Sequence, residues 1–267
     1  MVSYPELESI IGEKYQIKAL IGKGATAFVY KATHRYLQTD IALKILSPEL
    51  SERDKKIEDI FFEEASHLSK MDHPNLVRVL DADKMGGYSY IAMELLYGVS
   101  LEQMIKDKII IKPTQALKII RDVCYALEYS LTFGFVHRDV KPANIMIMPD
   151  DKVKILDFGL SKKIGQPVKY QIIGGPMCGT LYYMSPEQLT DSDRVDQRAD
   201  LYSIGATLYH AIIGKVPFET NNLSELVSMQ INNIPVPPVN LSPDVSYELS
   251  SMIMKLLEKS ASKRYST

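Results

Sequence analysis

The chain has 267 residues, 46% of them hydrophobic, so it is long and apolar enough to bury a large core, which excludes disorder as its main state. Its formal net charge of −2 at pH 7 gives no overall field that would attract nucleic acid or an anionic membrane, and we expect no nucleic-acid partner. The two cysteines, Cys124 and Cys178, lie far apart in sequence, which favours a reducing compartment over a disulfide framework and indicates a cytoplasmic location.

The first part of the chain is predicted to be rich in β-strands. Residues 1–14 carry acidic residues where a signal peptide needs a basic flank, so we interpret them as an N-terminal extension. No stretch reaches membrane-spanning length, and we expect no membrane insertion by this segment. One helix is expected over residues 54–71, because its apolar residues recur at helical spacing. The predicted strands cover residues 15–21, 28–32, 41–46, 76–80 and 88–93.

Helices are expected to dominate after Gly98, where the strand pattern breaks and where we place a lobe boundary. They are predicted over residues 113–134, 200–214 and 246–257. Between the first two, the segments IMIM and VKIL flank the turn residues PDD and indicate a hairpin. The predicted fold class is α+β and bilobal. A small β-rich N-lobe with one main helix and a larger helical C-lobe should leave a cleft, where ligand sites are commonly found.

The predicted hairpin brings two polar segments together. Antiparallel pairing places the segment HRDVKPAN beside the segment DFG. Asp139, Asn144 and Asp157 thereby gather near Lys141, and oxygen donors without clustered His or Cys suit Mg²⁺. Taken singly, each Asp is as readily a cap and the Asn a turn former, so only the combined spacing favours a metal site. Histidines 34, 67, 73, 137 and 210 show no ligand spacing, and we interpret them as structural or surface residues.

A second group of polar residues lies in the predicted sheet. Gly22 and Gly24 stand in a turn where glycine lets the backbone approach phosphate closely, although such a turn is often only a hairpin. A lone strand lysine such as Lys44 is normally a solvated edge residue. Glu64, however, falls on the buried stripe of the predicted helix, where a carboxylate is costly unless it is paired. We therefore predict a Lys44–Glu64 ion pair, with Glu63 left in water.

These segments, in this order, resemble the eukaryotic-type protein kinase family over nearly the whole chain, and they most resemble its bacterial Ser/Thr members. The matching motifs are the glycine-rich loop GKGATAFV, the ATP-anchoring strand IALK, the helix segment EEASHL, the hinge YIAMELLYG, the catalytic loop HRDVKPAN, the metal loop DFG and the box SPE. The resemblance implies a protein-kinase-like domain over residues 15–267, with an N-lobe at about 15–95, a hinge at about 93–98 and a C-lobe at about 98–267. The family fold normally adds one more helix, which we expect to be missing from this chain.

The resemblance also implies catalytic roles. Lys44, paired with Glu64, would bind the α- and β-phosphates of ATP. Asp139 would accept the proton of the substrate hydroxyl. Lys141, which is typical of the Ser/Thr kinases in the family, would stabilise the transferring phosphate.

Other matching residues are expected to bind nucleotide and metal. Asn144 and Asp157 would hold Mg²⁺ or Mn²⁺. The implied ATP-binding residues are Ile21, Gly22, Lys23, Gly24, Val29, Ala42, Lys44, Met93, Glu94, Leu96 and Met146. The implied regulatory spine consists of Leu68, Val79, His137 and Phe158, anchored by Asp200.

The chain departs from the family pattern in regions that bear on regulation and stability. Ala27 stands where the third loop glycine is usual, which should stiffen the loop slightly. Arg264 resembles the family arginine that pairs with Glu187, and we predict that this pair is largely buried. The hydroxyl-bearing residues of the activation segment are Ser161, Tyr170, Thr180, Tyr182, Tyr183 and Ser185.

Arg138, Tyr170 and Thr180 are the regulatory candidates. In the family, an arginine at the position of Arg138 belongs to the arrangement that grips an activation-loop phosphate. Between residues 162 and 178 the only hydroxyl in the sequence is that of Tyr170. We favour the interpretation that Arg138 braces the loop through backbone carbonyls over phosphotyrosine control.

The sequence therefore predicts a protein Ser/Thr kinase that transfers the γ-phosphate of Mg-ATP to Ser or Thr hydroxyls of protein substrates. The main alternative is a pseudokinase scaffold that binds nucleotide or partners without catalysis; loss of Lys44, Asp139 or Asp157 would indicate it, and none is lost. A small-molecule kinase of related fold is a second alternative, but such kinases lack the SPE box. A homodimer through the kinase domain is left open.

Overall fold

The computed structural model describes residues 7, 10–24, 26–53, 55–158, 162–163, 178–191 and 195–267, and only the backbone of residues 51–53, 162, 163 and 178. The chain divides into two units. Unit 1 comprises Met1–Asp72 and Leu76–Tyr97, and unit 2 comprises His73–Asn75 and Gly98–Thr267. The division thus falls at Gly98, where the strand pattern of the sequence breaks.

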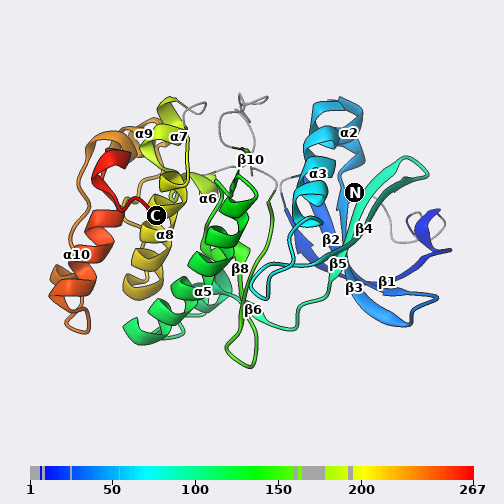
Figure 1. Ribbon diagram of the computed structural model, residues 1–267, viewed down its shortest axis with the longest axis horizontal. Helices are drawn as coiled ribbons and strands as arrows, with labels where there is room; N and C mark the ends of the chain where they lie inside the picture. Colours follow the sequence, from blue (N-terminus) through cyan, green and yellow to red (C-terminus); the bar gives the residue numbers. More distant parts are fainter. Residues whose placement is uncertain are drawn as a thin grey trace. The chain divides into compact units, whose positions relative to one another are not determined.

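Unit 1 contains a five-stranded antiparallel sheet (Figure 1). In sheet order the strands are β1 (Tyr15–Lys23), β2 (Ala27–His34), β3 (Thr39–Leu46), β5 (Tyr88–Glu94) and β4 (Val79–Met85). Two helical stretches, α2 (Pro48–Arg53) and α3 (Lys55–Leu68), follow β3, and α3 contacts β4 and β5. The buried residues of α3 are Phe61, Glu64, Ala65 and Leu68. Their spacing of three or four residues is the one-sided stripe that the sequence predicts.

Two apolar residues before β1 belong to the core of unit 1. Leu7 and Ile11 are 1% and 0% exposed, and they pack with Tyr15 in an apolar cluster that includes residues of β2, β3 and β5. The Lys14 ammonium lies 2.6 Å from the Asp81 carboxylate of β4, to which the Tyr15 hydroxyl donates at 2.9 Å. Leu7 and Ile11, which belong to the segment interpreted as an extension, therefore pack in the apolar cluster of the sheet.

Several boundaries in unit 1 differ from the prediction by one to five residues: β1 and β5 end later, β2 is longer at both ends, β3 begins earlier, and β4 ends later, at Met85. β4 begins three residues after the predicted start of the strand at 76–80. Leu76 and Val77 are neighbours and both are 2% exposed, whereas a half-buried strand alternates between buried and exposed residues. The helix predicted over 54–71 ends three residues early, at Leu68, and its predicted first residue lies outside the described residues.

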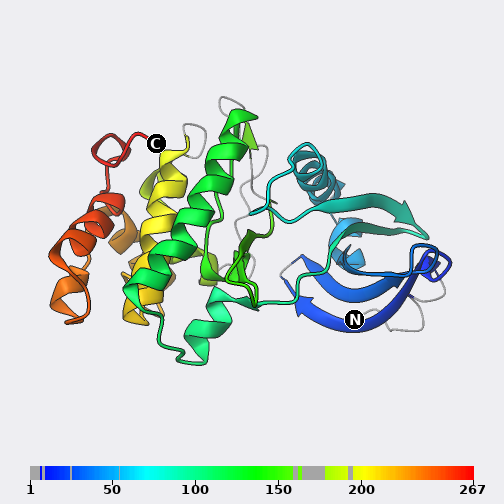
Figure 2. The same cartoon turned by 60° about the horizontal axis from the view of Figure 1, so that its bottom comes forward.

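Unit 2 is largely helical. Its described helices are α4 (Leu101–Lys106), α5 (Pro113–Thr132), α6 (Cys178–Leu181), α7 (Pro186–Thr190), α8 (Arg198–Ile213), α9 (Leu223–Asn232) and α10 (Tyr247–Leu256), with 3₁₀ turns at Pro142–Asn144, Pro238–Asn240 and Ala261–Lys263. Its described strands are β6 (Val99–Ser100), β7 (Phe135–Val136), β8 (Ile145–Ile147), β9 (Val153–Ile155) and β10 (Lys162–Lys163), paired as β6-β8-β9 and β10-β7. Figure 2 shows α5, α8 and α10 side by side, and α8 contacts both of the others.

α8 is the central helix of unit 2 and is buried over most of its surface. A Cβ at Gly205 would come within 2.7 Å of the Leu256 Cβ on α10, so the absence of a side chain lets the two helices approach closely. α8 ends at Gly214, whose φ of 75° is the left-handed conformation that commonly terminates helices. Gly134, with φ 80°, follows α5 in the same way. The predicted ends of both helices are confirmed.

The shorter helices of unit 2 were not predicted from the sequence. Two of them, α4 and α9, lie near residues of the candidate site. Both begin at a side-chain cap: the Ser100 hydroxyl accepts from the N–H of Gln103, and the Asn222 side chain accepts from the N–H of Glu225, each at 3.1 Å. These caps satisfy N–H groups that the first turn of a helix leaves unpaired. Of the helices that the structure describes, none is both long and apolar enough to cross a membrane.

Candidate active site

The ion pair predicted in unit 1 is present. Lys44 on β3 places its ammonium 2.8 Å from each carboxylate oxygen of Glu64 on α3. The two side chains are 12% and 4% exposed, whereas Glu63 faces solvent as predicted. Because the pair is largely withdrawn from water, it holds the lysine charge at a fixed point on the sheet.

The predicted ATP-binding residues of unit 1 occupy neighbouring strands. Val29 on β2 lies opposite Gly22 on β1 and opposite Lys44 on β3. Ala42 lies opposite Met93 on β5. The sheet register thus brings the glycine turn next to the lysine, while a small residue stands two positions before the lysine on the same strand face.

Alanine at the position of the family's third loop glycine has a structural reason. Ala27 is 4% exposed and belongs to an apolar cluster with Leu46, Phe61 and Ala65. Its carbonyl accepts the N–H of Gly24 at 2.8 Å, which closes the turn. The methyl group therefore anchors one side of the glycine turn in the core.

The remaining predicted nucleotide-binding residues are more exposed or belong to strand ends. Glu94, the last residue of β5, exchanges hydrogen bonds with the backbone of Arg78, and Leu96 is partly buried in the segment that follows. Met146 lies in unit 2, on β8 opposite Ser100. The exposed members of the set are Ile21, Lys23 and Gly24.

In unit 2, the predicted hairpin is confirmed and gathers the polar residues of the loop before it. β8 and β9 pair with Ile145 opposite Ile155, and the N–H of Leu156 donates to the carbonyl of Asn144 at 2.8 Å. The segment before the first strand therefore lies beside the segment after the second.

Asp139, Lys141 and Asn144 are joined by direct contacts. The Lys141 ammonium lies 2.7 Å from Asp139 Oδ2, and Asn144 Nδ2 donates to that oxygen at 3.1 Å and to the Asp139 carbonyl at 2.9 Å. Asp139 Oδ1 is buried and has no hydrogen-bond partner among the described residues. Burial raises the pKa of Asp139 to about 6, against the opposing effect of Lys141, and the negative charge of Asp157 adds to the rise. A higher pKa makes the carboxylate a better proton acceptor than an exposed aspartate.

Asp200 at the start of α8 holds the backbone of the loop. Its two carboxylate oxygens accept the N–H groups of Arg138 at 2.7 Å and His137 at 2.9 Å. Burial raises the pKa of Asp200 to about 6, and these two hydrogen bonds oppose the rise. Arg138 has φ 67°, a left-handed conformation that costs free energy and persists where neighbouring contacts fix it.

The predicted spine residues of unit 2 are in contact. His137 is completely buried, and its ring centre lies 4.4 Å from that of Phe158. Burial lowers the pKa of His137 to about 4, so its ring is neutral and structural at pH 7. Leu68 and Val79 belong to unit 1, where Leu68 is 1% exposed.

Asn144 and Asp157 fit a divalent metal by the chemistry of their donors. The amide nitrogen of Asn144 is engaged by Asp139, which leaves its amide oxygen as the ligand atom. Asp157 follows β9 with φ 57°, and its negative charge raises the pKa of Asp139. Within the described residues no group of three or more His, Cys, Asp or Glu could hold a metal ion. A set of two oxygens suits Mg²⁺, whose other ligands are phosphate and water.

The three regulatory candidates, Thr180, Arg138 and Tyr170, differ in what the structure shows of them. The Thr180 hydroxyl accepts a hydrogen bond from Lys141 at 2.8 Å, so Thr180 belongs to the network of the catalytic loop. Arg138 is 8% exposed and donates to the carbonyl of Val195 at 3.2 Å. Val195 follows the activation segment, so this bond does not test the predicted bracing of the loop by Arg138, which stays a prediction. Tyr170 lies outside the described residues.

The predicted pair of Arg264 and Glu187 is confirmed. The side chain of Arg264 is fully buried and donates to both carboxylate oxygens of Glu187. Its guanidinium also donates to the backbone carbonyls of Glu258, Arg198 and Lys259. The tail of the described chain is thereby fastened to α7.

Sequence reasoning missed two amide side chains near the site. Gln188 on α7 donates to the carbonyl of Arg138 at 2.8 Å. Gln230 on α9 donates to the carbonyls of Leu181 and Tyr182 and is 1% exposed. A signal for Gln230 exists in the sequence, because it lies four residues after the apolar Leu226, where a helix buries one face.

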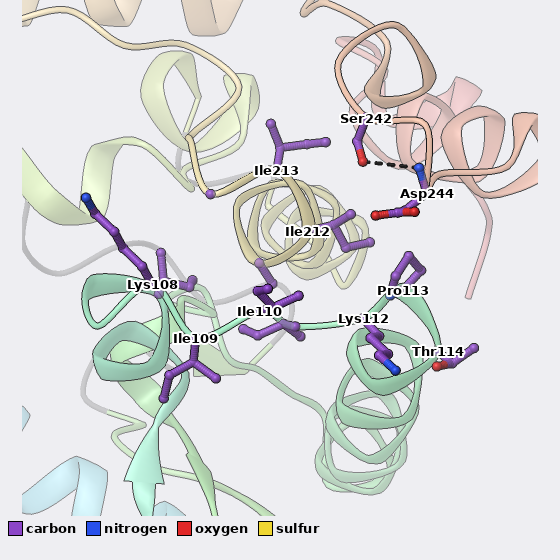
Figure 3. Close-up of a pocket in the computed structure, with 14 residues that line it drawn as sticks. Lys108, Ile109, Ile110, Lys112, Pro113, Thr114, Ile212, Ile213, Ser242 and Asp244 are labelled. Atoms are coloured by element: carbon purple, nitrogen blue, oxygen red, sulfur yellow. Dashed lines mark hydrogen bonds between the residues drawn. The ribbon is translucent and has the colours of Figure 1, made fainter.

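Unit 2 also contains a pocket of about 710 Å³ between the α4–α5 connection, the end of α8 and the segment before α10 (Figure 3). Figure 3 shows Ile110 and Ile212 on its apolar side, with Asp244 beside Pro113. None of the residues predicted for catalysis or ATP binding lines it.

A sheet with a buried Lys–Glu pair and a helical unit with a linked Asp–Lys–Asn loop are the parts that define a protein kinase domain. A sequence profile described as the protein kinase domain matches residues 15–267. The chain therefore belongs to the protein kinase family, whose members use ATP and divalent metal ions and act on protein substrates.

Curated relatives carry serine/threonine-protein kinase names. The kinase PknB of Mycolicibacterium smegmatis is 34% identical over 96% of this chain and 41% of the relative. PknB of Mycobacterium tuberculosis is 33% identical over 97% of this chain and 42% of the relative. A probable serine/threonine-protein kinase of Clostridium perfringens is 34% identical over 97% of this chain and 37% of the relative. The chain thus spans about two fifths of the length of these relatives.

Proposed function

We propose that this chain is the catalytic domain of a serine/threonine protein kinase, which transfers the γ-phosphate of Mg-ATP to Ser or Thr hydroxyls of protein substrates. The main support for this proposal is the environment of the Asp139 carboxylate. Asp139 Oδ2 is fixed by Lys141 and Asn144, whereas the buried Oδ1 has no hydrogen-bond partner among the described residues. A buried acceptor left open in this way is costly unless a ligand completes it, and a substrate hydroxyl supplies the missing donor.

The proposed reaction uses Asp139 as the proton acceptor. The substrate hydroxyl donates to Asp139 Oδ1, and its oxygen attacks the γ-phosphorus in line with the leaving group. The new P–O bond forms as the bond to the β–γ bridging oxygen breaks, ADP leaves, and the hydroxyl proton passes to Asp139. Lys141 is held by Asp139 and Thr180, so its positive charge is fixed where negative charge spreads over the transferred group.

Roles in nucleotide binding are proposed for residues of each unit taken by itself. In unit 1, Lys44, with its charge fixed by Glu64, binds the α- and β-phosphates, and Val29 and Ala42 contact the base. In unit 2, Met146 is the residue with a proposed base contact. The Asn144 amide oxygen and the Asp157 carboxylate would hold Mg²⁺, which would neutralise phosphate charge and help to orient the γ-phosphate. A pseudokinase scaffold is not favoured, because these ligands are present and Lys44 is already paired.

The experiment that tests the proposal is phosphate transfer from radiolabelled ATP to a peptide library. The modified residues are then identified by mass spectrometry. We expect phosphoserine and phosphothreonine. Products confined to phosphotyrosine would contradict the assigned substrate class, and nucleotide binding without any labelled peptide would support the scaffold alternative.

A further inference from the structure

The backbone at the end of α6 is held by bonds to its carbonyl groups. Gln230 on α9 donates to the carbonyl of Leu181 at 3.0 Å and to that of Tyr182 at 2.9 Å. The Ser203 hydroxyl on α8 donates to the next carbonyl, that of Tyr183, at 2.8 Å. Three consecutive carbonyls are thus bound by buried side chains, which fixes the path of the chain independently of its own side chains.

Gln230 is itself held in one orientation. Its side-chain oxygen accepts the hydroxyl of Tyr202 on α8, and its own backbone carbonyl accepts from the Lys259 ammonium at 2.8 Å. Backbone carbonyls only accept hydrogen bonds, so the amide nitrogen must face them while the amide oxygen faces Tyr202. A buried amide is tolerated when it is bonded in this way and is costly when it is not.

The held backbone leads directly to the proposed proton acceptor. Thr180 immediately precedes Leu181, and its hydroxyl accepts from the Lys141 ammonium at 2.8 Å. The same ammonium lies 2.7 Å from Asp139 Oδ2. Every step from α9 to Asp139 is therefore a direct contact or a single peptide link within unit 2. The backbone at Thr180 is thus two contacts away from the carboxylate to which the proposed substrate hydroxyl donates.

We infer that Gln230 is a positioning residue for the peptide substrate: it fixes the backbone at Leu181 and Tyr182 beside which the substrate lies, and through Thr180 it keeps Lys141 against Asp139. The inference rests on the proposed kinase function. Gln230 has no expected role in nucleotide binding, because it lies in unit 2 and most of the predicted ATP-binding residues belong to unit 1. Loss of the two amide donors should therefore impair the use of peptide and leave the use of ATP unchanged.

Two substitutions separate the donors of Gln230 from its volume. Gln230→Glu keeps the length of the side chain and an acceptor for Tyr202 but removes both N–H donors, and Gln230→Met removes every polar atom at similar length. Asn232→Leu, an amide-to-apolar change at an exposed position of the same helix, is the matched control. Steady-state kinetics would give KM for peptide and for ATP, and hydrogen–deuterium exchange would report on residues 178–185 without any need for activity.

Both Gln230 variants should raise the peptide KM by about tenfold, the loss expected for two net hydrogen bonds of ordinary strength, with the ATP KM within about twofold of the parent. Exchange in residues 178–185 should be faster in both variants and unchanged in Asn232→Leu. A peptide KM and an exchange rate like those of the parent would overturn the inference, as would equal rises in the KM values of peptide and ATP.

A further variant keeps the test decisive if the Gln230 variants do not fold. Tyr202→Phe removes the hydroxyl that orients the Gln230 amide and that also accepts from the Lys259 ammonium at 3.4 Å, and it should raise both the peptide KM and the exchange rate of residues 178–185. No change in either would overturn the inference. A parent protein that transfers no phosphate contradicts the proposed function, whereas the exchange measurement still decides whether Gln230 holds the backbone.

Discussion

Lys44 and Glu64 occupy positions that neither charge tolerates alone. At 12% and 4% exposure, each has lost most of its hydration, and the contacts at 2.8 Å to both carboxylate oxygens compensate for that loss. Removing one partner leaves an uncompensated buried charge, which costs far more than the pair contributes over two apolar residues. The pair therefore contributes to stability and to phosphate binding in separable ways.

Replacing Lys44 with Met should lower the free energy of unfolding by about 3–5 kcal/mol, because the Glu64 carboxylate stays buried without its partner. Adding Glu64→Gln should recover most of this loss but none of the nucleotide affinity, since only Lys44 carries the cation. Urea unfolding of the parent, both single variants and the double variant, with ATP titration calorimetry on each, measures both effects. Unfolding free energies that add within about 0.5 kcal/mol would show that the two charges do not interact.

Among the elements, the short segment before β1 contributes apolar side chains to the sheet of unit 1. Leu7→Ala and Ile11→Ala should each cost about 2–5 kcal/mol, because both residues are nearly inaccessible and truncation leaves a cavity. Thermal unfolding measures the effect, with the exposed Glu13→Ala as control. Equal melting temperatures for Leu7→Ala and Glu13→Ala would show that the segment is not part of the core.

The tail after α10 is fastened to α7 through Arg264. Arg264→Ala removes a fully buried guanidinium and leaves Glu187 without its partner, so we expect a loss of about 3–5 kcal/mol. For a chain of this size that loss corresponds to a fall of at least about 6 °C in melting temperature. The neighbouring exposed Lys263→Ala should melt like the parent. Melting of Arg264→Ala within about one degree of the parent would contradict the buried pair.

The sequence predicted elements where a local signal was strong. The helix ends at Gly134 and Gly214, the hairpin of β8 and β9 and the charge on the buried stripe of α3 all follow from spacing within one segment. Contacts between segments had no such signal: Gln230 meets Leu181 and Tyr182 only because α9 folds against α6. The predicted start of β4 was wrong because the apolar pattern includes Leu76 and Val77, two adjacent buried residues that precede the strand.

For the whole molecule, we consider whether phosphorylation of the activation segment controls activity. Arg138 is buried and donates to the carbonyl of Val195, and the sequence between residues 162 and 178 contains no Ser or Thr. We predict basal activity that is independent of Ser or Thr phosphorylation between residues 162 and 178. Phosphatase treatment and a Tyr170→Phe variant, each assayed on an external peptide, test this prediction. A loss of about tenfold in both, equivalent to about 1.4 kcal/mol, would make Tyr170 the switch instead.

In the proposed kinase reaction, Asp139 accepts the proton of the substrate hydroxyl. The most direct test compares phosphate transfer to a serine peptide by the parent and by Asp139→Asn, with Mg-ATP affinity measured on the same preparations. We expect the substitution to lower transfer by at least about 10²-fold and to leave the ATP affinity within about twofold of the parent, because Asp139 contacts the substrate hydroxyl and not the nucleotide. A variant that keeps most of its turnover, or a parent that binds Mg-ATP yet transfers no more phosphate than the variant, would contradict it.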